Sequence, residues 1–231
     1  MRMLASSCLA LFALLFLISC QKEADFTDPA QGGTGNGGNG TNPATSYYPL
    51  TKGSWWKYKD SLTGTTTSGT ATNVTKSING ITYTAVVATG GSQIDTSWIA
   101  SPQPNYYITV HGNSPNTGAG FNIVFHYLND TAAVGHNWEY NAGQGNGFTA
   151  IVKTTIVERN LSMTVTGKHF KNVIHTRLDL KYDMLGFIME AGTYDYFIAK
   201  GVGIIKVRTQ LLNFGVPVLQ SCADLTDHSI K

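Results

Sequence analysis

The nine residues Ile174-His175-Thr176-Arg177-Leu178-Asp179-Leu180-Lys181-Tyr182 decide the fold class. Their larger apolar side chains recur at every second position, with His, Arg, Asp and Lys between them. Successive side chains of a β-strand point to opposite faces of the sheet, so this period of two predicts a half-buried strand. We expect Leu178 to face the core, and Arg177 and His175 to face solvent.

The same alternation returns on both sides of this segment. Leu161 to Thr166 alternates in the same way, and Asn79-Gly80 separates two strand-like segments. Asn-Gly is a strong hairpin signal, because both central residues of a type I′ turn need positive φ. The further predicted strands are 55–59, 73–78, 81–87, 96–100, 106–111, 122–128, 150–157, 194–199 and 204–211.

These segments predict a mainly β protein with little helix. We find no convincing helical apolar stripe and expect at most one short helix, near Thr131 to Val134. The expected fold is a single antiparallel β domain over 46–231, built as a sandwich or as a curved, partly closed barrel, since either arrangement hides sheet edges.

Composition excludes two classes of protein. The chain carries 16 Lys and Arg against 14 Asp and Glu, spread along its length, and so lacks the basic stripe of a nucleic-acid binder. Its apolar content of 42 % is too high for a disordered chain.

The first residues resemble the export signal of a bacterial lipoprotein. Leu4 to Ile18 is an uncharged run of 15 residues, shorter than the roughly 20 of a transmembrane helix. It ends in Leu17-Ile18-Ser19-Cys20, which resembles a lipobox. The resemblance implies a signal peptide over 1–19 and a mature chain whose Cys20 carries diacylglycerol and an N-acyl chain, with no other cofactor. The chain would then bind the membrane through its lipid.

The residues after the cysteine predict where the protein is located and a flexible linker. Lys22, Glu23 and Asp25 resemble the Lys-plus-acidic signal that sends Bacteroidota lipoproteins to the outer face of the outer membrane. Gln31 to Thr45 contains six glycines and predicts a flexible coil, so that 20–45 is a lipidated linker. We expect a lipid-anchored, surface-exposed outer-membrane protein, with the periplasmic face as the alternative.

Three short motifs resemble an uncharacterised, Bacteroidota-type family of envelope lipoproteins, the DUF3108-like proteins. The first runs from Tyr48 to Tyr58 (YPLTKGSWWKY), the second from Val165 to Ile174 (VTGKHFKNVI) and the third from Tyr196 to Lys206 (YFIAKGVGIIK). The resemblance implies an antiparallel β fold and no established reaction, so it supplies no catalytic residues. Trp56 and Tyr58 should share the inward face of one strand.

No pattern of residues indicates catalysis or a metal site. The six histidines form no ligand pair at metal-site spacing, and there is no G-x-S-x-G elbow or phosphate loop. Carboxylates such as Glu139 and Glu158 could pair across a sheet, as in a glycosidase, but sequence spacing does not show it.

Aromatic residues are the best candidates for ligand contact. Trp55, Trp98, Tyr106, Tyr107, Trp138 and Tyr140 occur in a chain rich in Thr and Asn. Of these we select Trp98, Tyr106 and Trp138 as candidate contacts to a glycan or a hydrophobic ligand. The leading hypothesis is a non-enzymatic binding or structural module; a surface glycan-binding protein and a hydrolase with scattered catalytic groups are the alternatives.

Overall fold

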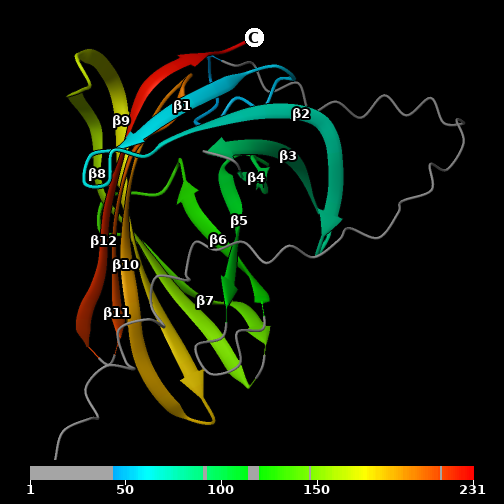
Figure 1. The fold of residues 1–231 in the computed structure, drawn as a ribbon, viewed down its shortest axis with the longest axis vertical. Coiled ribbons are helices and arrows are strands. Elements are labelled where there is room, and N and C mark those ends of the chain that lie inside the picture. Colours follow the sequence, from blue (N-terminus) through cyan, green and yellow to red (C-terminus); the bar gives the residue numbers. More distant parts are fainter. Residues whose placement is uncertain (1–43, 91–92, 114–119, 146, 214) are drawn as a thin grey trace, which may run out of the picture. The chain divides into compact units, whose positions relative to one another are not determined.

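The computed structural model describes residues 44–90, 93–113, 120–145, 147–213 and 215–231. Within these ranges the chain forms twelve strands (Figure 1). They are β1 (Trp55–Asp60), β2 (Thr66–Ile78), β3 (Ile81–Gly90), β4 (Gln93–Ala100), β5 (Asn105–Asn113), β6 (Gly120–Asn129), β7 (Asn137–Gly145), β8 (Phe148–Val165), β9 (Lys168–Met184), β10 (Phe187–Ala199), β11 (Gly203–Asn213) and β12 (Val216–Ser229).

The strands form one antiparallel sheet in the order β6-β5-β4-β3-β2-β1-β12-β11-β10-β9-β8-β7. Every neighbouring pair is consecutive in the chain except β1 and β12, which join the two ends of the domain. The sheet is strongly curved, with β2 bending over from one wall towards the other (Figure 1). The mainly β, antiparallel prediction is therefore confirmed, and the architecture is the curved, nearly closed barrel rather than the sandwich.

The expected helix near Thr131 to Val134 is wrong, because these residues form turns and irregular backbone. The side-chain oxygen of Asn129 accepts hydrogen bonds from the backbone N–H groups of Thr131 and Ala132. Such an Asx turn offers the backbone an alternative to helical bonding. Arg159 then donates to the carbonyls of Asp130 and Ala132. No helix among the described residues has the length and hydropathy to span a membrane.

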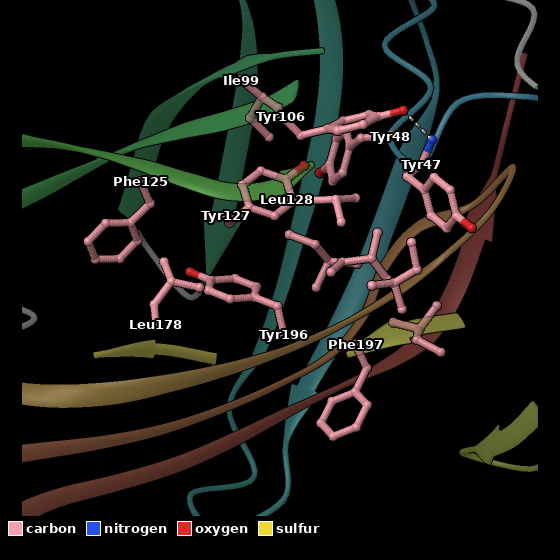
Figure 2. Close-up of a cluster of buried hydrophobic side chains, with 14 of the residues drawn as sticks. Tyr47, Tyr48, Ile99, Tyr106, Phe125, Tyr127, Leu128, Leu178, Tyr196 and Phe197 are labelled. Atoms are coloured by element: carbon pink, nitrogen blue, oxygen red, sulfur yellow. Dashed lines mark hydrogen bonds between the residues drawn. The ribbon is translucent and has the colours of Figure 1, made fainter. Parts of the chain in front are cut away.

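The core fills the space between the two walls of the sheet. Phe125 packs 5.1 Å from Tyr194, and Tyr127 packs 5.6 Å from Tyr196, measured between ring centroids. Figure 2 shows Phe125 and Tyr127 of β6 facing Tyr196 of β10 in this space. Leu178 is fully buried in the same core, which confirms the inward face predicted for its strand.

The first and third motifs, near the two ends of the domain, meet in space. The rings of Tyr48 and Trp56 lie 4.7 Å apart, and the Trp56 indole N–H donates to the carbonyl of Val202 at 2.6 Å. Tyr58 Oη donates to the carbonyl of Ile204 at 2.8 Å. These residues therefore form the framework that joins β1 to the β10–β11 turn, as expected for residues on the inward face.

Three hairpins whose two turn residues are both described have a turn ending in glycine, and in two of them the first turn residue, Thr166 or Leu185, is neither Gly nor Asn. Asn79-Gly80, Thr166-Gly167 and Leu185-Gly186 all have positive φ at both positions. A left-handed conformation costs an ordinary L-residue about 1–2 kcal/mol, whereas asparagine tolerates it. Leu185 has φ 53° and is fully exposed, so no packing contact offsets this cost.

Replacing Leu185 with asparagine should therefore stabilise the chain by about 1 kcal/mol. The matched control is Asn79→Leu, at the equivalent position of the β2–β3 hairpin with φ 51°, which should lose a similar amount. Urea unfolding of the purified chain measures both changes. A loss of stability in Leu185→Asn would show that the leucine makes a favourable contact that outweighs its backbone strain.

Candidate functional site

Six aromatic side chains, including that of His136 just before β7, line a groove with a cavity volume of about 860 Å³. We define the aromatic groove by Tyr83, Tyr107, His126, Trp138 and Tyr140, which come from β3, β5, β6 and β7. The tip of the β2–β3 hairpin, from Ile78 to Ile81, forms its other wall. This volume falls within the range of small-molecule sites, roughly 300–1,000 Å³.

The groove lies where the sheet nearly closes on itself. In the described residues no ladder pairs β6 with β7, although they are consecutive in the chain. Side chains bridge these two edges of the sheet, a place that we call the β6–β7 seam. The backbone N–H of His126 donates to Tyr140 Oη at 2.6 Å, and Thr154 Oγ1 donates to the His126 carbonyl at 3.0 Å. The edge of β6 therefore packs against side chains from β7 and β8, and not against a strand edge.

Register explains why rings from both strands meet at this seam. Tyr107 pairs with His126 across β5 and β6, on the face opposite Phe125, which lies in the core. Tyr140 of β7 pairs with Val152, which is fully buried, so Tyr140 lies on the inward face of its strand. The inward face of β7 thus meets the outward face of β6.

The rings form a continuous row. The centroids of Tyr107 and His126 lie 4.5 Å apart with an interplanar angle of 26°, and those of His126 and Trp138 lie 4.8 Å apart at 41°. Tyr83 extends the row, with its ring centroid 6.4 Å from that of Tyr107. The Trp138 indole nitrogen is buried and has no hydrogen-bond partner among the described residues.

The groove carries little charge. Burial lowers the pKa of His126 to about 4, so its imidazole is neutral at pH 7, with Nε2 3.0 Å from Asn105 Oδ1. Burial also raises the pKa of Tyr83 to about 12 and that of Tyr140 well above its ordinary value. Glu139 is the one Asp, Glu, Lys or Arg among the described lining residues.

Lowering the pH should destabilise the fold through His126. The unfolded ring takes up a proton near pH 6.5, whereas the folded ring resists protonation down to about pH 4. Because the unfolded state binds more protons between these values, stability falls as the pH falls through this window, by about 2 kcal/mol at pH 4.5.

Urea unfolding at pH 7 and pH 4.5 tests this prediction, with His126→Gln as the non-titrating variant. Burial also lowers the pKa of His228, but that contribution is common to both proteins. The parent should therefore lose about 2 kcal/mol more than the variant over this pH step. Equal losses would mean that His126 protonates as readily when folded as when unfolded.

The three aromatic residues selected from sequence have three different surroundings. Trp138 lines the aromatic groove, whereas Trp98 lies outside its lining and is covered by the Lys76 ammonium, 4.0 Å from the ring centroid. Tyr106 is fully buried, with its hydroxyl donating to Asp130 Oδ2 at 2.9 Å and accepting from the Tyr47 N–H at 3.1 Å (Figure 2). A ligand cannot reach a ring with no exposed area, so Tyr106 is not a contact residue in this structure.

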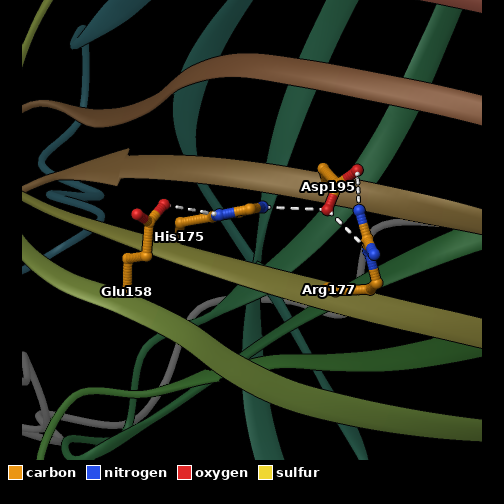
Figure 3. A network of polar contacts seen from close by, with 4 residues as sticks. All are labelled: Glu158, His175, Arg177 and Asp195. Atoms are coloured by element: carbon orange, nitrogen blue, oxygen red, sulfur yellow. Dashed lines mark hydrogen bonds and ion pairs between the residues drawn. The ribbon is translucent and has the colours of Figure 1, made fainter. Parts of the chain in front are cut away.

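A polar cluster surrounds His175, outside the aromatic groove. The expectation that the His175 side chain is solvated is wrong. His175 is only 8 % exposed and its ring stacks on Phe197 at 4.3 Å. Figure 3 shows its imidazole between two carboxylates: Nδ1 lies 3.2 Å from Glu158 Oε2, and Nε2 lies 2.8 Å from Asp195 Oδ1. Arg177 donates two further hydrogen bonds to Asp195, at 2.9 and 3.0 Å.

The His175 cluster has the geometry of a structural network. Burial opposes ionisation of Asp195, but hydrogen bonds from His175 and Arg177 outweigh it and lower the pKa of the carboxyl to about 2. Both imidazole nitrogens are engaged by carboxylates, so neither is left to accept a proton from a substrate. Glu158 lies in this cluster and Glu139 in the groove, so the structure does not bring these two candidate carboxylates into one site.

Other predicted positions fall outside the described residues or form no site. Cys20, Lys22, Glu23 and Asp25 lie outside the described ranges. Among the residues that the structure does describe, no three His, Cys, Asp or Glu side chains are grouped so that they could hold a metal ion.

Comparison with known proteins gives two similar solved structures. One is an exported protein with a YmcC-like fold from Bacteroides fragilis, with 9 % identity and a TM-score of 0.47. The other is a lipoprotein from Parabacteroides distasonis, with 13 % identity and a TM-score of 0.47. Each match covers 80 % of this chain and 99 % of the other. No family model and no curated protein matches the sequence, so the resemblance to the DUF3108-like family is not confirmed.

Proposed function

We propose that this chain is a lipid-anchored protein of the bacterial envelope that binds a ligand in the aromatic groove without transforming it. The observation that carries the proposal is the row of rings at the β6–β7 seam, which lines the cavity of about 860 Å³. Clefts of this size, lined by aromatic side chains with a few polar groups, are typical ligand sites.

Binding without turnover agrees with the ionisation of the groove. A general base works best when its pKa lies near the working pH. The pKa of His126 is about 4, and that of Tyr83 is about 12, so neither group is matched to proton transfer at pH 7. The exposed Glu139 is the one carboxylate among the described lining residues, so the groove holds no carboxylate pair of the kind that a glycosidase uses.

A thermal-shift panel tests the groove as the binding site. A ligand that binds only the folded state raises the melting temperature by mass action. The panel contains neutral and acidic glycans, fatty acids and short peptides, applied to the parent, Trp138→Leu and Trp98→Leu. We expect at least one class to raise the melting temperature of the parent and of Trp98→Leu, but not of Trp138→Leu. A panel without any shift, or an equal shift in all three proteins, would contradict the proposal.

Location in the envelope is tested separately, because it depends on lipidation of Cys20. Cys20→Ala should leave an unprocessed precursor without acyl label, and normal labelling would contradict the anchor. For display on the cell surface we rely on Lys22, Glu23 and Asp25. Protease added to intact cells should remove the domain, and Lys22→Ala with Glu23→Ala should protect it. Protection of the unmodified protein would place it on the periplasmic side.

A further inference from the structure

We infer that the aromatic groove takes an uncharged glycan, whose sugar rings stack on Tyr107 and Trp138 and whose hydroxyl groups bond to amide side chains at the rim. This inference rests on the proposed function, since it names the ligand class of the same groove. It joins three properties of the described lining: ring surface, amide groups and the absence of Lys and Arg.

The ring surface is suited to a flat, partly apolar ligand. Tyr107 and Trp138 are each half-buried, and their rings pack 4.5 Å and 4.8 Å from the His126 ring, centroid to centroid. One face of a pyranose ring presents only C–H groups, and an aromatic face buries these favourably. The partly exposed rings of Tyr107 and Trp138 therefore offer apolar surface on which sugar rings can stack.

Amide side chains at the rim provide the polar complement. Asn79 stands at the tip of the β2–β3 hairpin, and Asn141 and Gln144 stand on β7; all three are exposed and line the groove. An amide both donates and accepts hydrogen bonds, as a sugar hydroxyl does, so each can bond to hydroxyls in either direction. An acyl chain in the same place would remove water from these amides without replacing their hydrogen bonds, which is costly.

The lack of cationic groups disfavours acidic ligands. Carboxylates and phosphates are recognised by Arg and Lys, and the described lining contains neither. The nearby Lys76 lies over the Trp98 ring, outside the lining, and Glu139 would repel an anion. Neutral sugars therefore fit better than uronic acids, phosphorylated glycans or lipid headgroups.

Titration calorimetry with a charge-matched pair of glycans tests the inference. The probes are neutral hexasaccharides, cellohexaose and mannohexaose, and an acidic hexagalacturonate. They are titrated into the full chain, held in a detergent without a sugar headgroup so that detergent cannot compete. Trp138→Leu removes a ring from the groove, and Trp98→Leu is the matched change outside it.

We expect a neutral hexasaccharide to bind at least tenfold more tightly than the acidic one. Trp138→Leu should weaken this binding at least tenfold, and Trp98→Leu should leave it within twofold. Preference for the acidic glycan, or failure of both neutral hexasaccharides to bind, would overturn the inference. The groove itself would survive if a fatty acid or peptide bound there with the same dependence on Trp138. If no ligand depended on Trp138, the inference and the proposed function would both fall.

Discussion

Replacing Leu178 with aspartate is expected to destabilise the chain by about 4–5 kcal/mol, a large part of the stability of an ordinary domain. Leu178 is fully buried on β9, and its register partners Thr154 and Tyr194 are on the neighbouring strands of the same wall. The substitution removes apolar packing and places a carboxylate where no cation lies opposite in the register. Urea unfolding of the purified chain measures the loss.

Lys171→Asp is the matched control, because Lys171 is on the same strand but exposed. It should change stability by less than about 1 kcal/mol. Arg177→Asp, a small change if Arg177 were simply solvated, is now expected to be costly because it would replace the partner of Asp195 with a second carboxylate. Equal effects at Leu178 and Lys171 would mean that the inward face of β9 is assigned wrongly.

Trp56→Ala is expected to cost about 4 kcal/mol, as is usual when a buried tryptophan is truncated to alanine. The ring is fully buried against Tyr48, and its indole N–H donates to the Val202 carbonyl. Truncation opens a cavity and also leaves that carbonyl without its donor. Because this contact joins β1 to the β10–β11 turn, we expect the whole sheet to unfold at lower urea, and not one strand alone.

The neighbouring Trp55 gives the control for residue type. Trp55 lies on the same strand, partly exposed and outside the main core cluster. Trp55→Ala should cost about 1 kcal/mol, so the two variants should differ by about 3 kcal/mol. If Trp55→Ala were the more damaging of the two, the framework role of the contact between the first and third motifs would be refuted.

Local patterns in the sequence predicted much of the fold. Alternation located β9 and its buried face at Leu178, and Asn79-Gly80 located the β2–β3 hairpin. Two strands escaped notice for physical reasons. β7 alternates only over Trp138, Tyr140 and Ala142 before it runs into Gly143 and Gly145, and β12 contains Pro217, which lies at a register shift opposite Leu212. Both are defined by their partners in the sheet more than by their own residues.

The candidate site was less accessible from sequence, because it forms where two faces of the sheet meet. Alternation places His126 outward on β6 and Tyr140 inward on β7, and nothing local shows that the seam brings these faces together. The prediction that the His175 side chain is solvated was wrong for a related reason. Alternation gave its outward direction correctly, but not the cover that Phe197, Glu158 and Asp195 give to its ring. The sequence pattern therefore predicts to which face of the sheet a side chain points, but its exposure depends on the side chains that pack over it in the folded protein.

The most direct test of ligand binding in the aromatic groove follows the indole N–H signals of the four tryptophans by NMR during titration with a neutral hexasaccharide. Each signal is assigned by replacing Trp55, Trp56, Trp98 and Trp138 in turn with phenylalanine. We expect the Trp138 signal to shift saturably, because Trp138 lines the groove and a ligand stacked there changes the magnetic surroundings of its indole, while the Trp56 and Trp98 signals stay in place. A shift confined to Trp55 or Trp98, or no shift in any indole signal, would contradict ligand binding in the aromatic groove.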